Sequence, residues 1–137
     1  VAQWRQTVMK GTLQISDPVK RIEKLIDNDL NIYLGTQVFK GGCFFLNTLV
    51  ELSGQSPEMS RHILRGFIKF SKLIQRWLEE AEQEQLIREG LNHREMANFI
   101  FVSLNGAAAL FAATHDKEVL ELTSNQLHQY LSQFKTT

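Results

Sequence analysis

The stretch between residues 57 and 83 constrains the fold more than any other part of this 137-residue chain. Its apolar side chains recur every three or four residues, at Met59, Ile63, Phe67, Phe70, Ile74, Trp77 and Ala81. A basic stripe displaced by two residues contains Arg61, Arg65, Lys69, Lys72 and Arg76. On a helix this displacement is about 200° around the axis, which puts the two stripes on opposite faces. The pattern predicts a long amphipathic helix with one packed face and one solvated face.

Capping residues mark the other helix boundaries. Asp17 before Pro18 is typical of a helix start, as is Ser56 before Pro57. Asn92 followed by Glu95 indicates a capping pair for a later helix. The predicted helices cover residues 1–10, 18–33, 43–53, 57–90, 92–114 and 116–134. Because no long segment alternates with a period of two, the predicted fold is all-α, a single six-helix bundle-like domain over residues 1–137.

Composition narrows the function classes. Fifteen Lys and Arg residues balance fifteen Asp and Glu residues, so no net charge directs the chain to nucleic acid or an anionic membrane. One cysteine cannot form an internal disulfide, which fits a reducing cytoplasm. The longest uninterrupted apolar runs are shorter than the roughly 20 residues that span a bilayer, so we expect no membrane segment.

A family resemblance is carried by the segment GCFFLNTLVEL, residues 42–52, and by the Ser-Pro-Glu helix start that follows it. Further matches are the long helix with Trp77, the glycine at position 90 and an apolar helix containing Gly106. In order and spacing, nearly the whole chain resembles the C-terminal ligand-sensing domain of the TetR/AcrR family of bacterial transcription regulators.

The resemblance implies a two-part transcription regulator that acts as a repressor, with an N-terminal helix-turn-helix domain and a C-terminal domain whose ligand alters DNA binding. The DNA-binding part is absent from this sequence, so Val1–Lys10 is expected to be the end of the linker helix. The implied partners are a second copy of the chain, forming a homodimer, an unidentified and largely apolar small-molecule effector, and DNA through the absent domain only. No membrane partner or cofactor is implied.

The resemblance also places the effector among the first five helices. The predicted ligand-binding residues are Ile26, Leu30, Tyr33, Cys43, Asn47, Phe67, Phe70, Ile74, Trp77, Phe101 and Asn105. The alternative is that the aromatic and aliphatic members are ordinary core and that Asn47 satisfies a backbone group. Cys43, at a helix start, could also be a thiol that senses electrophiles, although a buried inert cysteine is the commoner case.

The last two helices are those that the family pairs into a four-helix bundle between two subunits. The predicted dimer-interface residues are Val102, Gly106, Ala109, Ala113, Leu120, Leu127, Leu131 and Phe134. Small residues at three of these positions allow close helix approach. The alternative is that this apolar surface packs within one subunit.

Catalytic and metal-binding patterns are missing from the sequence. The four histidines, His62, His93, His115 and His128, have no metal-ligand spacing, and the chain contains no nucleophile motif or phosphate loop. We therefore expect neither an enzyme nor a metal site. The rival to the sensing domain is a helical dimerisation or protein-interaction module that binds no small molecule, which a densely filled interior would favour.

Overall fold

The computed structural model describes the chain over residues 2–33 and 57–137. The third predicted helix, with Cys43 and Asn47, lies outside these residues. Regular structure in the described ranges is helical, apart from one isolated antiparallel bridge between Ile87 and Lys135. The all-α fold class is therefore confirmed.

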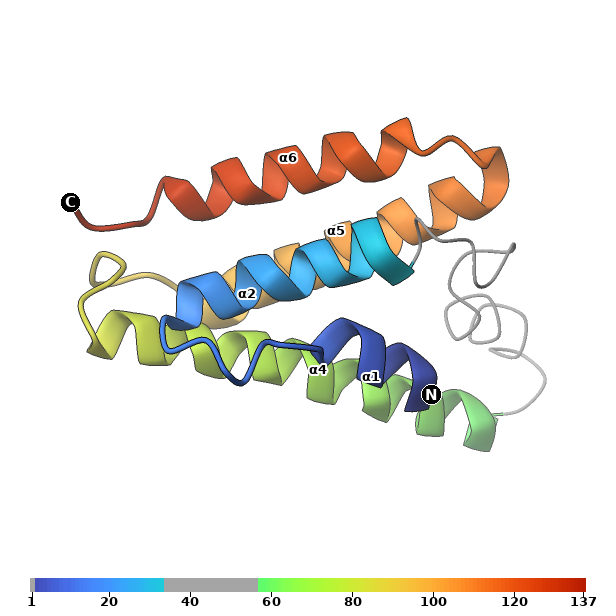
Figure 1. Ribbon diagram of the computed structural model, residues 1–137. Coiled ribbons are helices and arrows are strands. Elements are labelled where there is room, and N and C mark those ends of the chain that lie inside the picture. The colour runs from blue at the N-terminus through green and yellow to red at the C-terminus, as the bar shows by residue number, and fades with distance from the viewer. Residues whose placement is uncertain (1, 34–56) are drawn as a thin grey trace.

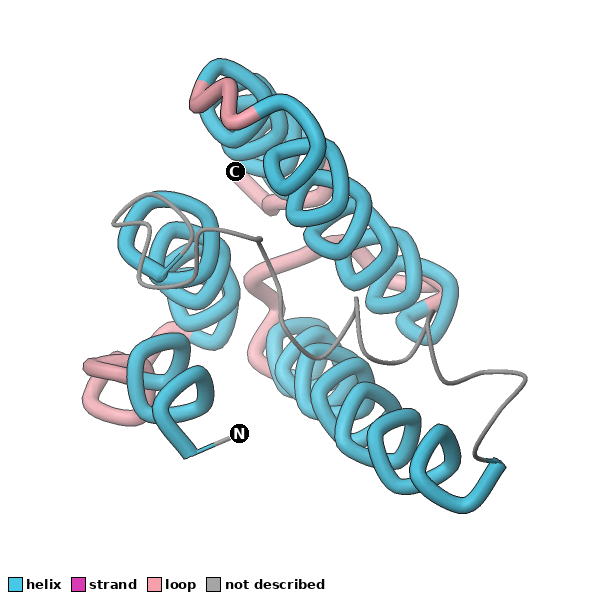
Figure 2. The backbone as a smooth tube through the Cα atoms, turned by 90° about the vertical axis from the view of Figure 1, so that its right-hand side faces the viewer, coloured by secondary structure: helices cyan, strands magenta, loops and turns pink. Residues whose placement is uncertain are grey.

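The described elements follow the predicted order. They are α1 (Ala2–Met9), α2 (Pro18–Asp27), the π-helical segment η1 (Asn28–Tyr33), α4 (Pro57–Gln83), α5 (His93–Thr114) and α6 (Glu118–Ser132). In Figure 1, α6 lies along one side of the molecule, α4 and α1 lie along the other, and α2 and α5 lie between them. The view in Figure 2 shows the four longer helices surrounding a common interior, with α1 attached beside α2.

The interior is formed by the apolar stripes of these four helices. Its fully buried members include Ile22, Leu25, Ile26 and Leu30 from α2 and η1, Ile74 and Leu78 from α4, Ile100 and Phe111 from α5, and Leu127 and Leu131 from α6. The stripe predicted on α4 is confirmed at Phe70, Ile74, Trp77 and Ala81, which are all buried. The helices thus meet through the faces that their spacing predicts.

Local capping chemistry explains two of the helix starts. The Asp17 carboxylate accepts hydrogen bonds from the backbone N–H groups of Val19 at 2.8 Å and Lys20 at 3.3 Å. The Asn92 side chain accepts one from the N–H of Glu95 at 3.1 Å. Each cap satisfies donors that the first turn of a helix leaves unpaired.

The predicted end of the long helix is wrong. Helix α4 stops at Gln83 rather than continuing to Gly90, because Gln85 adopts a left-handed conformation with φ of 62°. The intervening Glu and Gln residues are good helix formers, which is why the sequence favoured continuation. Tertiary packing overrides this propensity: Ile87 turns inward, is buried, and pairs with Lys135 near the end of the chain.

Candidate functional site

Most of the predicted effector residues that the structure describes meet between α2, η1, α4 and α5. Ile26, Leu30, Ile74, Phe70 and Trp77 belong to one buried cluster, and Phe101 packs against it. The side chains of Tyr33, Cys43 and Asn47 lie outside the described residues. The described members of the predicted set therefore form two groups. The half-buried rim consists of Phe67, Phe101 and Asn105, and the buried floor consists of Ile26, Leu30, Phe70, Ile74 and Trp77.

The rim is aromatic. The Phe101 ring lies 5.7 Å from the Phe67 ring in an edge-to-face arrangement and 6.1 Å from the Phe70 ring, centroid to centroid. These are favourable aromatic separations, and an incompletely buried aromatic cluster is suited to a flat apolar ligand. Asn105 uses its amide to donate to the backbone oxygen of Phe101, one turn earlier, at 2.9 Å. Its described polar contact is thus within its own helix.

The predicted dimer-interface residues fall into two groups. Val102, Gly106, Ala109 and Ala113 are exposed on one face of α5, where Phe99 and Leu110 are exposed with them. We call these six residues the α5 outer stripe. They recur at the spacing of one helical face, opposite the buried Ile100, Leu104 and Phe111.

The predicted interface residues of α6 are placed differently within the subunit. Leu120, Leu127 and Leu131 are buried in the core of their own subunit, and Phe134 is half-buried. Their spacing directs them toward α2 and α5, whereas Leu122 is the large apolar side chain on the outer side of α6. Of the two helices, α5 therefore has the larger exposed apolar face, with Phe99, Val102 and Leu110 exposed against Leu122 alone among the large apolar residues of α6.

Helix α5 is apolar around most of its circumference. It is long and apolar enough, by length and composition, to cross a membrane, with 39% of its most apolar window buried. No uninterrupted apolar run in the sequence marks this helix, because Asn98, Ser103 and Asn105 divide it. One such helix is weak evidence for a membrane span, because core helices of soluble proteins have the same composition. One side of α5 packs into the interior, and on the other side Val102 and Leu110 are more than half exposed.

Aromatic side chains extend the end of this surface. Tyr130 contacts Phe99 at 4.7 Å and Phe134 at 5.0 Å between ring centroids, and the Arg88 guanidinium lies 5.2 Å from the Phe134 centroid. Burial, with a smaller effect from the negative charge of Glu95, raises the pKa of the Tyr130 phenol. The Tyr130 hydroxyl therefore stays protonated and uncharged throughout the physiological range.

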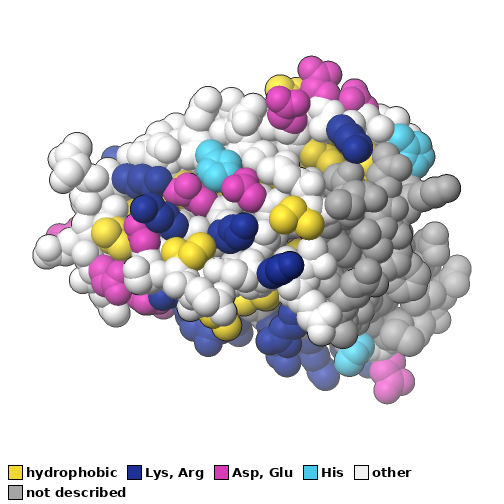
Figure 3. Space-filling view, viewed as in Figure 1, with side chains coloured by type: hydrophobic (Ala, Val, Ile, Leu, Met, Phe, Trp, Pro, Cys, Tyr) yellow, Lys and Arg dark blue, Asp and Glu magenta, His cyan; other side chains and the backbone are white. Residues whose placement is uncertain are grey.

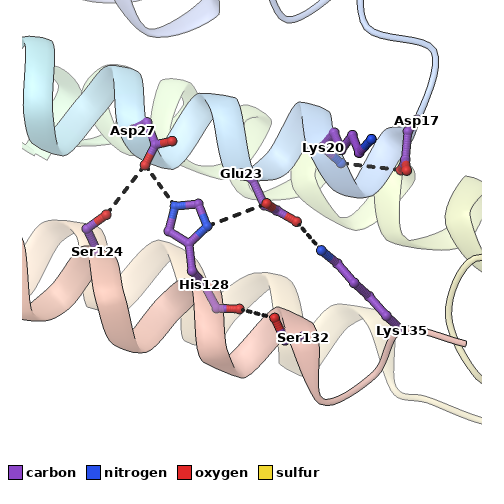
Figure 4. Close-up of polar contacts among 8 residues, drawn as sticks. All are labelled: Asp17, Lys20, Glu23, Asp27, Ser124, His128, Ser132 and Lys135. Atoms are coloured by element: carbon purple, nitrogen blue, oxygen red, sulfur yellow. Dashed lines mark hydrogen bonds and ion pairs between the residues drawn. The ribbon is translucent and has the colours of Figure 1, made fainter. Parts of the chain in front are cut away.

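A polar cluster that the sequence analysis did not predict joins α2 to α6 (Figure 4). The His128 ring lies between two carboxylates, with Nε2 at 2.8 Å from Asp27 Oδ1 and Nδ1 at 3.5 Å from Glu23 Oε2. Ser124 donates to Asp27 at 3.4 Å, and Lys135 Nζ lies 2.7 Å from Glu23 Oε1. The sequence shows only that Glu23 and Asp27 are one helical turn apart on the same face. It does not show their partners on α6, which are about a hundred residues away in the chain.

The basic stripe of α4 remains a solvated face. Arg61, Arg65, Lys69, Lys72 and Arg76 are all exposed, and none takes part in an ion pair with another described residue. Figure 3 shows cations gathered along the lower edge of the molecule, where α4 runs, and both signs of charge mixed elsewhere on that face. Among the described residues, no group of three His, Cys, Asp or Glu side chains is placed to hold a metal ion.

The described helices enclose a packed interior, and α5 has an apolar face whose Val102 and Leu110 no other described residue covers. Residues 18–127 match the family of tetracycline-repressor-like C-terminal domains. The chain belongs to this family, which confirms the resemblance seen in its sequence. A comparison with curated proteins gave no match.

Two solved structures show the same fold. The first is a TetR transcriptional regulator from Chloroflexus aurantiacus, with a TM-score of 0.84 and 19% identity over 98% of this chain and 66% of that one. The second is a TetR-family transcriptional regulator from Cytophaga hutchinsonii, with a TM-score of 0.84 and 15% identity over 99% of this chain and 68% of that one. The chain thus spans about two thirds of the length of these regulators.

Proposed function

We propose that this chain is the effector-binding and dimerisation domain of a cytoplasmic bacterial transcriptional regulator, acting as a repressor. DNA is contacted through an N-terminal domain that α1 leads to, as in a TetR-like protein. The domain has no catalytic role and needs no cofactor. Family membership and the solved regulators of the same fold support this assignment.

The observation that carries the proposal is the α5 outer stripe. Val102 is 57% exposed, Leu110 56% and Phe99 48%, on a helix whose other face is core. A helix that is apolar all round is normally covered on both sides. A second copy of the chain, related by a twofold axis, would cover the stripe with the same stripe.

The effector is proposed to bind at the half-buried rim, where the rings of Phe67 and Phe101 lie above the buried Phe70. A flat, uncharged or weakly charged molecule suits this rim, since its described lining is apolar with a single amide nearby. Binding must favour one arrangement of the two DNA-binding domains over another. Shifting such an equilibrium from 1:99 to 99:1 requires about 5.5 kcal/mol of differential affinity.

Thermal unfolding of the chain in the presence of a panel of flat aromatic compounds tests this proposal. We expect at least one compound to raise the melting temperature by several degrees, because a ligand at 100 times its Kd stabilises the native state by about 2.7 kcal/mol. In the variant Phe101→Ala we expect the affinity for that compound to fall at least about tenfold while the dimer persists.

Phe99→Ala is the matched control, since Phe99 lies on the same helix but on the outer stripe. It should weaken the dimer and leave compound affinity within about twofold. If no compound stabilises the chain, or if both variants weaken binding equally, the effector role fails.

The rival function is a dimerisation or protein-interaction module without a ligand. It is favoured by the floor of the proposed site, where Ile26, Leu30 and Ile74 are fully buried, and by the bond of Asn105 to its own helix. The compound panel separates the two, because the rival predicts a dimer that no compound stabilises.

A further inference from the structure

Asp27 and Asn28, adjacent residues at the α2–η1 junction, contact two different helices: Asp27 contacts α6, and Asn28 contacts the end of α1. Asn28 is 1% exposed, and its Nδ2 donates to the backbone oxygens of Val8 at 2.9 Å and Lys10 at 2.8 Å. The end of a helix leaves carbonyl groups unpaired, and a side-chain amide carries two hydrogens, one for each acceptor. Asn28 therefore fixes the C-terminal end of α1 to the junction.

Asp27 faces the other way. Its Oδ1 contacts His128 Nε2 at 2.8 Å and Ser124 Oγ at 3.4 Å, both on α6, as Figure 4 shows. Glu23, one turn earlier on α2, supports the same histidine at 3.5 Å and contacts Lys135 at 2.7 Å. The ring of His128 thus has a carboxylate at each nitrogen, and both carboxylates belong to α2.

The junction is also where the helix changes its geometry. The N–H of Asn28 is shared between the oxygens of Leu25 and Lys24, and the π-helical segment η1 begins at this residue. A π-helical turn contains about one more residue than an α-helical turn, so a change between the two reorients every side chain that follows. In η1 the following residues include Leu30, which is part of the floor of the proposed effector site.

We propose that the Asp27–Asn28 pair is a joint that couples the position of α6 to that of α1. The inference rests on the proposed function for its meaning: α1 leads to the DNA-binding domain, and α6 packs on the helix that carries the dimer surface. A shift of α6 that moves His128 also displaces Asp27, because the two side chains are bonded to each other. Asn28, which follows Asp27 in the chain, is then displaced together with the last turn of α1, to which it is hydrogen-bonded. Asn28 acts as a positioning residue and touches neither effector nor DNA.

Hydrogen–deuterium exchange of the chain, read at the amides of α1, tests the joint. Asn28→Ala should accelerate α1 exchange at least about tenfold, since it removes two buried hydrogen bonds. His128→Ala should also accelerate α1 exchange, by about threefold or more, although His128 does not touch α1. The double variant should exchange at α1 no faster than Asn28→Ala alone, because both changes act through one connection.

Asn125→Ala, at an exposed position on α6, is the control and should leave α1 exchange unchanged. Asp27→Asn keeps the side-chain size and serves if His128→Ala does not fold; it should reproduce the α1 effect. The joint is overturned if these changes alter exchange only in α2 and α6. Failure of the proposed function is detected by other measurements, namely a monomeric mass or a compound panel without any stabilising compound. Neither measurement depends on the exchange rate of α1, so the two failures can be told apart.

Discussion

Ile74→Ala is expected to lower the free energy of unfolding by about 2–5 kcal/mol, the usual cost of truncating a buried aliphatic side chain to alanine. Ile74 has no exposed surface, lies on α4, and faces the interior formed with α2 and α5. Urea unfolding at a fixed protomer concentration measures the change, because the stability of an oligomer depends on concentration.

The control for this variant is Lys72→Ala, two residues earlier on the exposed face of the same helix. It should change stability by no more than about 0.5 kcal/mol. A loss below about 1 kcal/mol for Ile74→Ala would contradict the packed floor described for the site, because it would mean that the side chain has few neighbours to lose.

Val102→Glu is expected to raise the dissociation constant of the dimer at least about a hundredfold. The side chain is 57% exposed and is the most exposed large apolar residue of the α5 outer stripe. A twofold interface contains the substitution twice, and each carboxylate would lose water without gaining a partner. Since a tenfold change in Kd corresponds to about 1.4 kcal/mol, the expected cost is about 3 kcal/mol or more.

Sedimentation equilibrium over a dilution series measures this dissociation constant. Leu13→Glu is the matched control, because Leu13 is 69% exposed in the turn between α1 and α2, away from α5. It should leave the dimer intact. Equal dissociation constants for wild type and Val102→Glu would place the interface elsewhere.

Features that depend on neighbouring residues were predictable from the sequence. The starts of α2 and α5 follow from Asp17 and Asn92, whose side chains bond to the backbone within three residues. The buried stripe of α4 follows from helical spacing alone. Ile26, Leu30 and Trp77, predicted as ligand-binding residues with ordinary core as the alternative, are all buried, and their contact with an effector stays a prediction.

Features that depend on distant parts of the chain were not predictable. The end of α4 is set by the burial of Ile87 against the C-terminal segment, and spacing cannot show that contact. The bond between Asp27 and His128 joins residues 101 positions apart. Spacing likewise identified an apolar stripe on α6 but could not show that Leu127 and Leu131 are buried against other helices of the same subunit.

The division of α5 into a buried face and an outer stripe explains why one helix can serve two purposes. Ile100, Leu104 and Phe111 hold the subunit together, while Val102, Gly106 and Ala109 lie on the other side. The aromatic rim at Phe101 lies between these faces, beside α4. A ligand at the rim would therefore contact the helix that carries the proposed dimer surface, so the proposed sensing and assembly roles would share one element.

The most direct test of this account is the mass of the unmodified chain in solution, measured by light scattering at micromolar concentration. The protomer has a mass of 15.8 kDa. The account predicts twice that mass, because the α5 outer stripe needs a second copy to cover it. A mass of 15.8 kDa that persists as the concentration is raised would contradict the account, since the stripe would then be stable while exposed to water.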